Sequence, residues 1–211
     1  MTIDNSNKKR LTAKIQKPRI IKSFYETIIA EGFDNASIAK VAKRLDIHPT
    51  LILHYFGNKE NMTLALVDFV IESYWKIFKK LRDQHKHKNP DERLQAFCKT
   101  IWSRPYYEKI NIAGTFSVLS VGFRNPRIKK KITYLYEEYT VLLVKELKEL
   151  AKLGAIEKND FHRTAKLLIS MAEGARHFHP FLIRAKDLTQ YNRDMTTAVI
   201  ILLKSKPDHY T

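Results

Sequence analysis

The chain contains one cysteine, six glycines and seven prolines among 211 residues, which is little for this length. The single cysteine, Cys98, excludes an intrachain disulfide and a metal site built from several cysteines, and it fits a reducing compartment. So few glycines and prolines argue against many tight hairpins and favour long helices. The sequence also lacks the alternation typical of strands and any internal repeat. These absences predict an all-α protein.

Long hydrophobic runs are missing as well. A membrane-spanning helix needs about 20 consecutive apolar residues, and no segment reaches that length without a charge. The first twenty residues, MTIDNSNKKRLTAKIQKPRI, lack the apolar centre of a signal peptide. We therefore expect a cytoplasmic protein with no membrane partner.

The signatures of common enzymes are absent too. The sequence has no Gly-x-Ser-x-Gly motif, no glycine-rich phosphate loop and no nucleophile and base at an informative spacing. His177 and His179 lie two residues apart on a predicted helix, where they point in different directions and supply too few ligands for a metal. We expect no enzymatic activity, no cofactor and no metal.

Acidic residues are outnumbered, because 22 Asp and Glu stand against 38 Lys and Arg, which gives a formal net charge of +16 at pH 7. Such a charge favours a polyanionic partner, either nucleic acid or an anionic membrane surface. A polar segment over residues 1–17 has little to bury, and we expect it to be a flexible basic tail. It contains Lys8, Lys9, Arg10, Lys14 and Lys17.

Apolar residues recur at helical spacing along most of the chain, and we expect about nine helices. The first begins at Pro18 and ends at Gly32, two short helices begin at Ser37 and Pro49, and a longer one begins at Asn58. Further helices are expected around residues 93–102, 107–122, 126–154, 160–182 and 188–204.

Two of these helices, joined by a tight turn at Asp46, form a helix-turn-helix pattern. In the second, which begins at Pro49, one face is apolar and suited to a core: Ile52, Tyr55 and Phe56. The other face carries Pro49, Thr50, Leu53 and His54. An exposed leucine beside threonine and histidine suits a major groove, where threonine can bond base edges and leucine can contact a thymine methyl.

Phosphate contacts are expected beside this face. The helix N-termini at Ser37 and Asn58 expose amides that bind anions, and Lys59 lies next to the second. The alternative is that the helix beginning at Pro49 is simply a core helix of a bundle. The basic residues around it disfavour that alternative. The residues that we expect to contact DNA are Ser37, Pro49, Thr50, Leu53, His54, Tyr55 and Lys59.

The segment EGFDNASIAKVAKRLDIHPTLILHYFGNKENM, residues 31–62, resembles the DNA-binding domain of TetR-family transcriptional regulators. It has that family's Glu-x-Gly-aromatic helix end, Ser helix start, Ala-containing second helix, aromatic-Phe helix end and Lys-Glu opening of the fourth helix. Two residues depart from the pattern, since Asp46 replaces the usual Gly and His48 replaces the usual Ser or Thr cap. Asp tolerates the left-handed conformation, whereas we expect His48 to cap less well than a hydroxyl.

The resemblance implies a homodimeric repressor that binds a double-stranded DNA operator and is released by a small-molecule effector. It divides the chain into a tail (1–17), a three-helix helix-turn-helix domain (18–65) and a helical bundle for ligand binding and dimerisation (66–211). Two segments, HYFGNKE and LLISMAEGARHF, are loosely similar to the choline-responsive betaine-pathway subgroup. The rival function is a structural protein that binds nucleic acid or anionic membrane surfaces without sequence preference, and competitor DNA separates the two.

Two further surfaces are candidates in the C-terminal region. Aromatic residues there line either a small-molecule pocket or simply a core, and the ligand-binding candidates are Trp102, Tyr106, Tyr107, Phe116 and Arg176. Because only Glu108 lies among nearby basic residues, we expect a neutral or anionic amphipathic ligand, with Arg176 available to a carboxylate. For the dimer we expect the last two helices, through Ala172, Gly174, Ala175 and the apolar run TAVIILL at residues 197–203; the alternative is a monomer whose last helix is buried.

Overall fold

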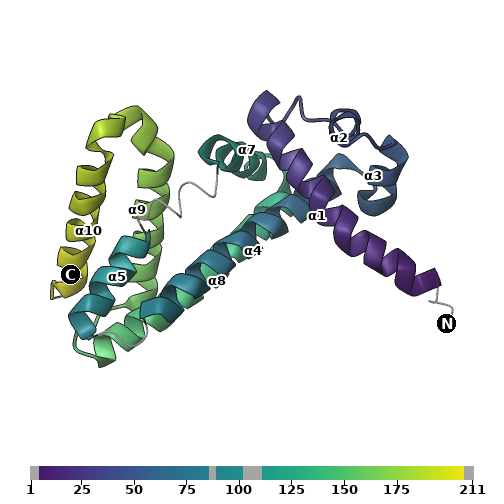
Figure 1. The fold of residues 1–211 in the computed structure, drawn as a ribbon. Coiled ribbons are helices and arrows are strands. Elements are labelled where there is room, and N and C mark those ends of the chain that lie inside the picture. The colour runs from purple at the N-terminus through teal and green to yellow at the C-terminus, as the bar shows by residue number, and fades with distance from the viewer. Residues whose placement is uncertain (1–4, 86–88, 102–110, 207–211) are drawn as a thin grey trace. The chain divides into compact units, whose positions relative to one another are not determined.

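The computed structural model describes residues 5–85, 89–101 and 111–206, and within these ranges every regular element is a helix (Figure 1). The all-α prediction is therefore confirmed. The elements are α1 (Asn5–Glu31), α2 (Ile38–Leu45), α3 (Pro49–Phe56), α4 (Lys59–His85), α5 (Pro90–Ile101), α7 (Ile112–Gly122), α8 (Pro126–Lys152), α9 (Phe161–Leu182), the short 3-10 helix η1 (Ala185–Asp187) and α10 (Leu188–Lys204).

The helices pack into two compact units. The first unit contains residues Met1–Tyr74 and Ala113–Thr133, and the second contains Trp75–Ile112 and Tyr134–Thr211. Helix α7 and the start of α8 thus pack with the N-terminal helices, although they are distant in sequence. At Gly114 the approach is close, because a Cβ there would lie only 2.7 Å from Cε2 of Tyr25 on α1.

Helix α1 begins at Asn5, so the prediction that this helix starts at Pro18 is wrong. The proline has no N–H for the carbonyl of Lys14, and its ring crowds that carbonyl, which costs about 3 kcal/mol in a helix interior. Residues 5–17 nevertheless include Lys, Arg, Leu, Ala and Gln, which are good helix formers. Pro18 therefore removes one hydrogen bond without ending the helix.

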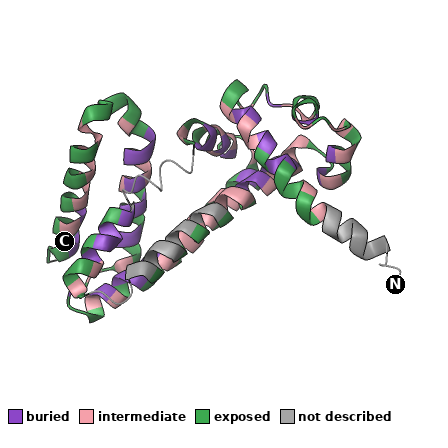
Figure 2. Cartoon of the chain, viewed as in Figure 1, coloured by how far each residue is buried: buried purple, intermediate pink, exposed green. Residues whose placement is uncertain are grey.

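The core of the first unit is formed by the buried side chains of its helices (Figure 2). Helix α1 contributes side chains at intervals of three and four residues, as an amphipathic helix does. Among the core residues are Ile20, Phe24 and Ile28 from α1, Val41 and Ala42 from α2, Ile52 and Phe56 from α3, Met62 and Leu66 from α4, Val118 from α7 and Ile128 from α8.

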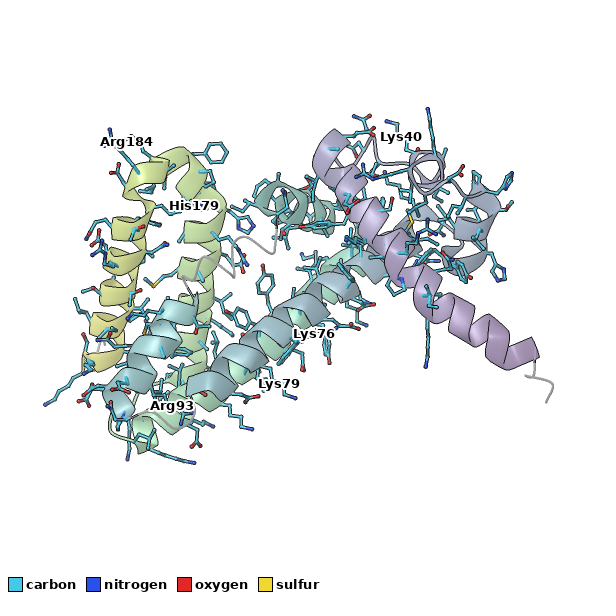
Figure 3. All side chains as sticks on the ribbon, in the orientation of Figure 1. Lys40, Lys76, Lys79, Arg93, His179 and Arg184 are labelled. Carbon is cyan, nitrogen blue, oxygen red and sulfur yellow. The ribbon has the colours of Figure 1, made fainter. Side chains whose placement is uncertain are left out.

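The second unit has its own core, formed by α5, α8, α9 and α10. Cys98 of α5 lies fully inside it, and burial raises the pKa of its thiol to about 12. An ion pair between Arg93, labelled in Figure 3, and Glu146 joins α5 to α8 at 2.8 Å. Cys98 is thus a core side chain of this unit.

Several predicted helix ends are confirmed by backbone geometry. The Ser37 side chain accepts the Lys40 N–H at the start of α2, and Asp160 caps α9 in the same way. Asp46 has φ 53° and ψ 52°, and Gly57 ends α3 with φ 76°. These are positions at which local residue type decides the conformation.

The two faces of α3 give a direct test of this packing. Ile52→Ala removes a side chain with no exposed surface and should lower the free energy of unfolding by about 2–5 kcal/mol. The neighbouring Leu53→Ala removes a side chain that is 43% exposed and should cost less than about 1 kcal/mol. Denaturant unfolding measures both values, and equal losses would contradict the assignment of the two faces.

Candidate nucleic-acid interface

The turn between α2 and α3 holds the two helices in a fixed relation. The N–H of Asp46 donates to the last turn of α2, and the N–H of Ile47 donates to the carbonyl of Ala42 at 3.1 Å. Arg19 of α1 donates to the carbonyl of Leu45 at 3.2 Å, which satisfies another terminal group of α2. These bonds occupy the backbone groups that a helix end leaves open.

Helix α3 separates its residues into an inner and an outer face, as expected. Ile52 and Phe56 are buried, whereas Thr50, Leu53 and His54 are exposed. Tyr55 is intermediate, because its ring packs against the core and also meets the His54 ring edge-on at 5.4 Å. The outer face thus presents a hydroxyl, an isobutyl group and an imidazole together.

The first turn of α3 begins at His48. Pro49 occupies the first helical position, where its missing N–H has no consequence. Nδ1 of His48 accepts the N–H of Thr50 at 3.4 Å, so the imidazole does cap the helix. Sequence reasoning did not include His48 in the site, although its departure from the usual Ser or Thr was the signal for it.

Lys59 is held by the loop between α1 and α2. Its ammonium donates to the carbonyls of Phe33 at 2.6 Å and Asp34 at 3.3 Å, and lies 4.4 Å from the centre of the Phe33 ring. Burial lowers the pKa of Lys59, while the Asp34 carboxylate partly opposes that shift. A lysine has three N–H donors, and these two carbonyls account for two of them.

Basic side chains of α2 are partly engaged with α1. Lys40, labelled in Figure 3, pairs with Glu31, and Arg44 pairs with Glu26 at 3.1 Å. All four side chains are more than a third exposed, so these pairs add little to stability. They orient α2 while leaving its cations accessible to an anionic partner.

A family model described as bacterial regulatory proteins, tetR family, matches residues 20–66, which contain the second half of α1, all of α2 and α3, and the start of α4. This match supports a TetR-family regulator. The resemblance of residues 31–62 to that family's DNA-binding domain is thereby confirmed. The TetR-family pattern covers the part of the chain in which the helix-turn-helix geometry is found.

Curated relatives match this chain over part of their length. The HTH-type transcriptional regulator BetI of Paraburkholderia phytofirmans is 29% identical over 83 residues, which are 39% of this chain and 42% of that protein. BetI 1 of Chromohalobacter salexigens is 24% identical over 116 residues, or 55% and 57%. The matches span about half of the length of these relatives.

Solved structures share the fold over most of the chain. A TetR transcription regulator from Haloarcula marismortui has a TM-score of 0.75 at 14% identity, covering 90% of this chain and 98% of that one. A structure from Saccharomonospora viridis in complex with choline has a TM-score of 0.74 at 14% identity, with the same coverage. These likenesses concern the fold.

The predicted ligand-binding residues are not gathered into one described site. Trp102, Tyr106 and Tyr107 lie outside the described residues. Phe116 belongs to the first unit, where it is 54% exposed, and Arg176 belongs to the second. Their shared role in a pocket therefore stays a prediction.

Arg176 is a buried charge in the core of the second unit. Its side chain is 2% exposed and pairs with the carboxylate of Glu173. His177 lies beside them, and burial lowers its pKa, against the opposing effect of Glu173. Because Glu173 already compensates Arg176, a ligand carboxylate would have to compete with it.

Some of the residues expected at a dimer surface lie inside the second unit's own core. Ala172, Ala175 and Val199 are buried there, because helical periodicity defines a face without saying which neighbour covers it. The expectation that the last two helices form the dimer stays a prediction. The same two helices expose other large apolar side chains. These are Leu167, Phe178, Phe181 and Leu182 on α9 and Ile201 and Leu202 on α10.

Metal ligands are not clustered in the part of the chain that the structure describes. There, no three His, Cys, Asp or Glu side chains are grouped in a way that could hold a metal ion. None of the described helices is both long enough and apolar enough to span a membrane.

Proposed function

We propose that this TetR-family chain is a sequence-specific transcriptional regulator that binds a palindromic DNA operator as a homodimeric repressor and is released by a small-molecule effector. The observation that carries the proposal is the outer face of α3, where Thr50, Leu53 and His54 are exposed while the opposite face is buried. A rigid two-turn helix with such a face fits a major groove.

Phosphate contacts would position this helix on the duplex. The Ser37 end of α2 and the ammonium of Lys59 supply donors or positive charge beside α3. Such contacts give affinity without sequence preference, whereas the outer face of α3 supplies the preference. The net charge of +16 supports the same partner.

Homodimerisation is supported by the apolar side chains that α9 and α10 leave exposed. Phe181 is 85% exposed, Leu182 is 71% exposed and Ile201 is 61% exposed. Exposed apolar side chains of this size favour association, and a two-fold dimer presents one recognition helix to each half of a palindrome. We place the interface on these side chains.

The effector would act by population shift, in the cytoplasm as expected from the sequence. A ligand that binds better when the two recognition helices are wrongly spaced for DNA lowers the DNA-bound population. The buried pair Glu173 and Arg176 is our candidate polar group for such a ligand in the second unit. An internal ion pair in an apolar core is costly to desolvate, which is consistent with a functional role.

The alternative function, a structural protein that binds nucleic acid or anionic membrane surfaces without sequence preference, rests on the net charge and the basic residues of segment 1–17. Selection of bound duplexes from a random pool separates the two functions. The proposed regulator enriches an inverted repeat, whereas a structural binder enriches none and is competed equally by every duplex.

Two substitutions, at Lys59 and at Thr50, should have different effects on DNA binding. Lys59→Ala removes a phosphate donor and should weaken binding to all duplexes by a similar factor, whereas Thr50→Ala should change the order of preference among them. Titration of each variant against the selected operator and single-base variants measures both effects. Because Lys59 also holds the α1–α2 loop, the free energy of unfolding of the Lys59→Ala variant is measured in parallel. An unaltered preference in Thr50→Ala would show that the docking face is misassigned.

The dimer is tested with charges on exposed side chains only. Phe178→Glu combined with Ile201→Glu would place carboxylates in the proposed apolar interface and should yield monomers that bind a full operator poorly. Phe123→Glu is the matched control, because that side chain is 88% exposed in the first unit and should leave the dimer intact. Sedimentation gives the masses, and a dimeric double variant would move the interface elsewhere.

The effector is sought by a thermal-shift screen of fatty acids, aromatic acids and quaternary amines, followed by DNA release. We expect a neutral or anionic amphipath to raise the melting temperature and to release the operator, since Arg176 can meet a polar head group and the surrounding core is apolar. Arg176→Met should abolish the shift if it retains a cooperative melt. Stabilisation by quaternary amines alone would reverse the expected ligand class.

A further inference from the structure

His48 and Thr50 form a side-chain couple at the first turn of α3. Nδ1 of His48 lies 3.4 Å from the backbone nitrogen of Thr50 and within hydrogen-bonding distance of Oγ1 of the same residue. Both side chains are exposed. The first turn is the part of a recognition helix that reaches base edges.

The backbone contact decides which nitrogen of the imidazole carries the proton. A backbone N–H can only donate, so Nδ1 must present its lone pair, and in a neutral imidazole the proton then lies on Nε2. The same Nδ1 is also the acceptor in its contact with the hydroxyl of Thr50. The hydrogen of the Thr50 hydroxyl is therefore directed to His48, and Oγ1 keeps only lone pairs for any other partner.

We propose that His48 makes Thr50 an acceptor-only group, which selects a base that presents an exocyclic amino group in the major groove. The inference rests on the proposed DNA-binding function. Adenine N6 and cytosine N4 are the amino donors there, whereas thymine O4 and guanine O6 and N7 are acceptors that would oppose the lone pairs of Oγ1. A hydroxyl that rotates freely can pair with either class.

The test is a double-mutant cycle between the protein and the operator. Selection with the wild-type chain gives the operator, and Thr50→Val, which replaces the hydroxyl by a methyl group, identifies the base pair that Thr50 reads. Duplexes are then made that lack either the amino group or the opposing carbonyl oxygen of that pair. Loss of the amino group should weaken wild-type binding by about threefold to tenfold, and it should have no further effect on Thr50→Val. Loss of the carbonyl oxygen should affect both proteins alike.

Two variants of His48 separate capping from orientation of the hydroxyl. His48→Asn offers an amide oxygen where Nδ1 stands, so it can accept both donors and should keep the coupling. His48→Ala leaves the hydroxyl free to rotate, so it can donate to a carbonyl oxygen as well as accept from an amino group. Exchanging the two bases of the pair between the strands weakens wild-type binding, and this penalty for reversing the base pair should be smaller in His48→Ala by at least about threefold. Thermal melts establish that both variants are folded under the binding conditions.

The outcomes are distinguishable from those of the proposed function. Coupling of Thr50 to the carbonyl oxygen, or to neither group while a specific operator is still bound, overturns the inference and leaves the regulator intact. Retention of the full penalty in His48→Ala overturns the inference in the same way. Equal competition by every duplex refutes the proposed function and this inference with it.

Discussion

Burial of Ile52 and Phe56 is the constraint on which the recognition surface depends. Helix α3 has eight residues, and helices shorter than about 12 residues are marginal in water by themselves. Each buried side chain of this size contributes roughly 1.5–3 kcal/mol. Because the two side chains lie four residues apart, they fix one face of α3 inward. The outward direction of Thr50 and Leu53 follows from that packing.

Local chemistry made the helix-turn-helix predictable. Ser37 caps α2, Asp46 adopts the left-handed conformation and Gly57 ends α3, and each of these roles follows from the residue itself. The assignment of inner and outer faces needs only the period of 3.6 residues, so Ile52 and Leu53 were placed correctly.

The remaining features depend on tertiary contacts or rotamers, which sequence patterns do not encode. The close approach at Gly114 joins α7 to α1 across nearly 90 residues of chain, and no local signal marks it. Val199 lies in the run TAVIILL at residues 197–203, which is apolar nearly all round, so periodicity cannot tell core from interface. Lys59 and His48 have flexible side chains, and only the folded chain shows which groups they meet.

Folding and binding are separable on α3 but coupled at Lys59. The side chains of Thr50 and Leu53 point away from the core, so operator preference can change there with little cost to stability. Lys59, in contrast, holds the loop carbonyls of Phe33 and Asp34, and burial lowers its pKa. A DNA phosphate at this ammonium would favour its charged form and offset that desolvation. The loop between α1 and α2 is therefore held by the same charge that we propose as a phosphate contact.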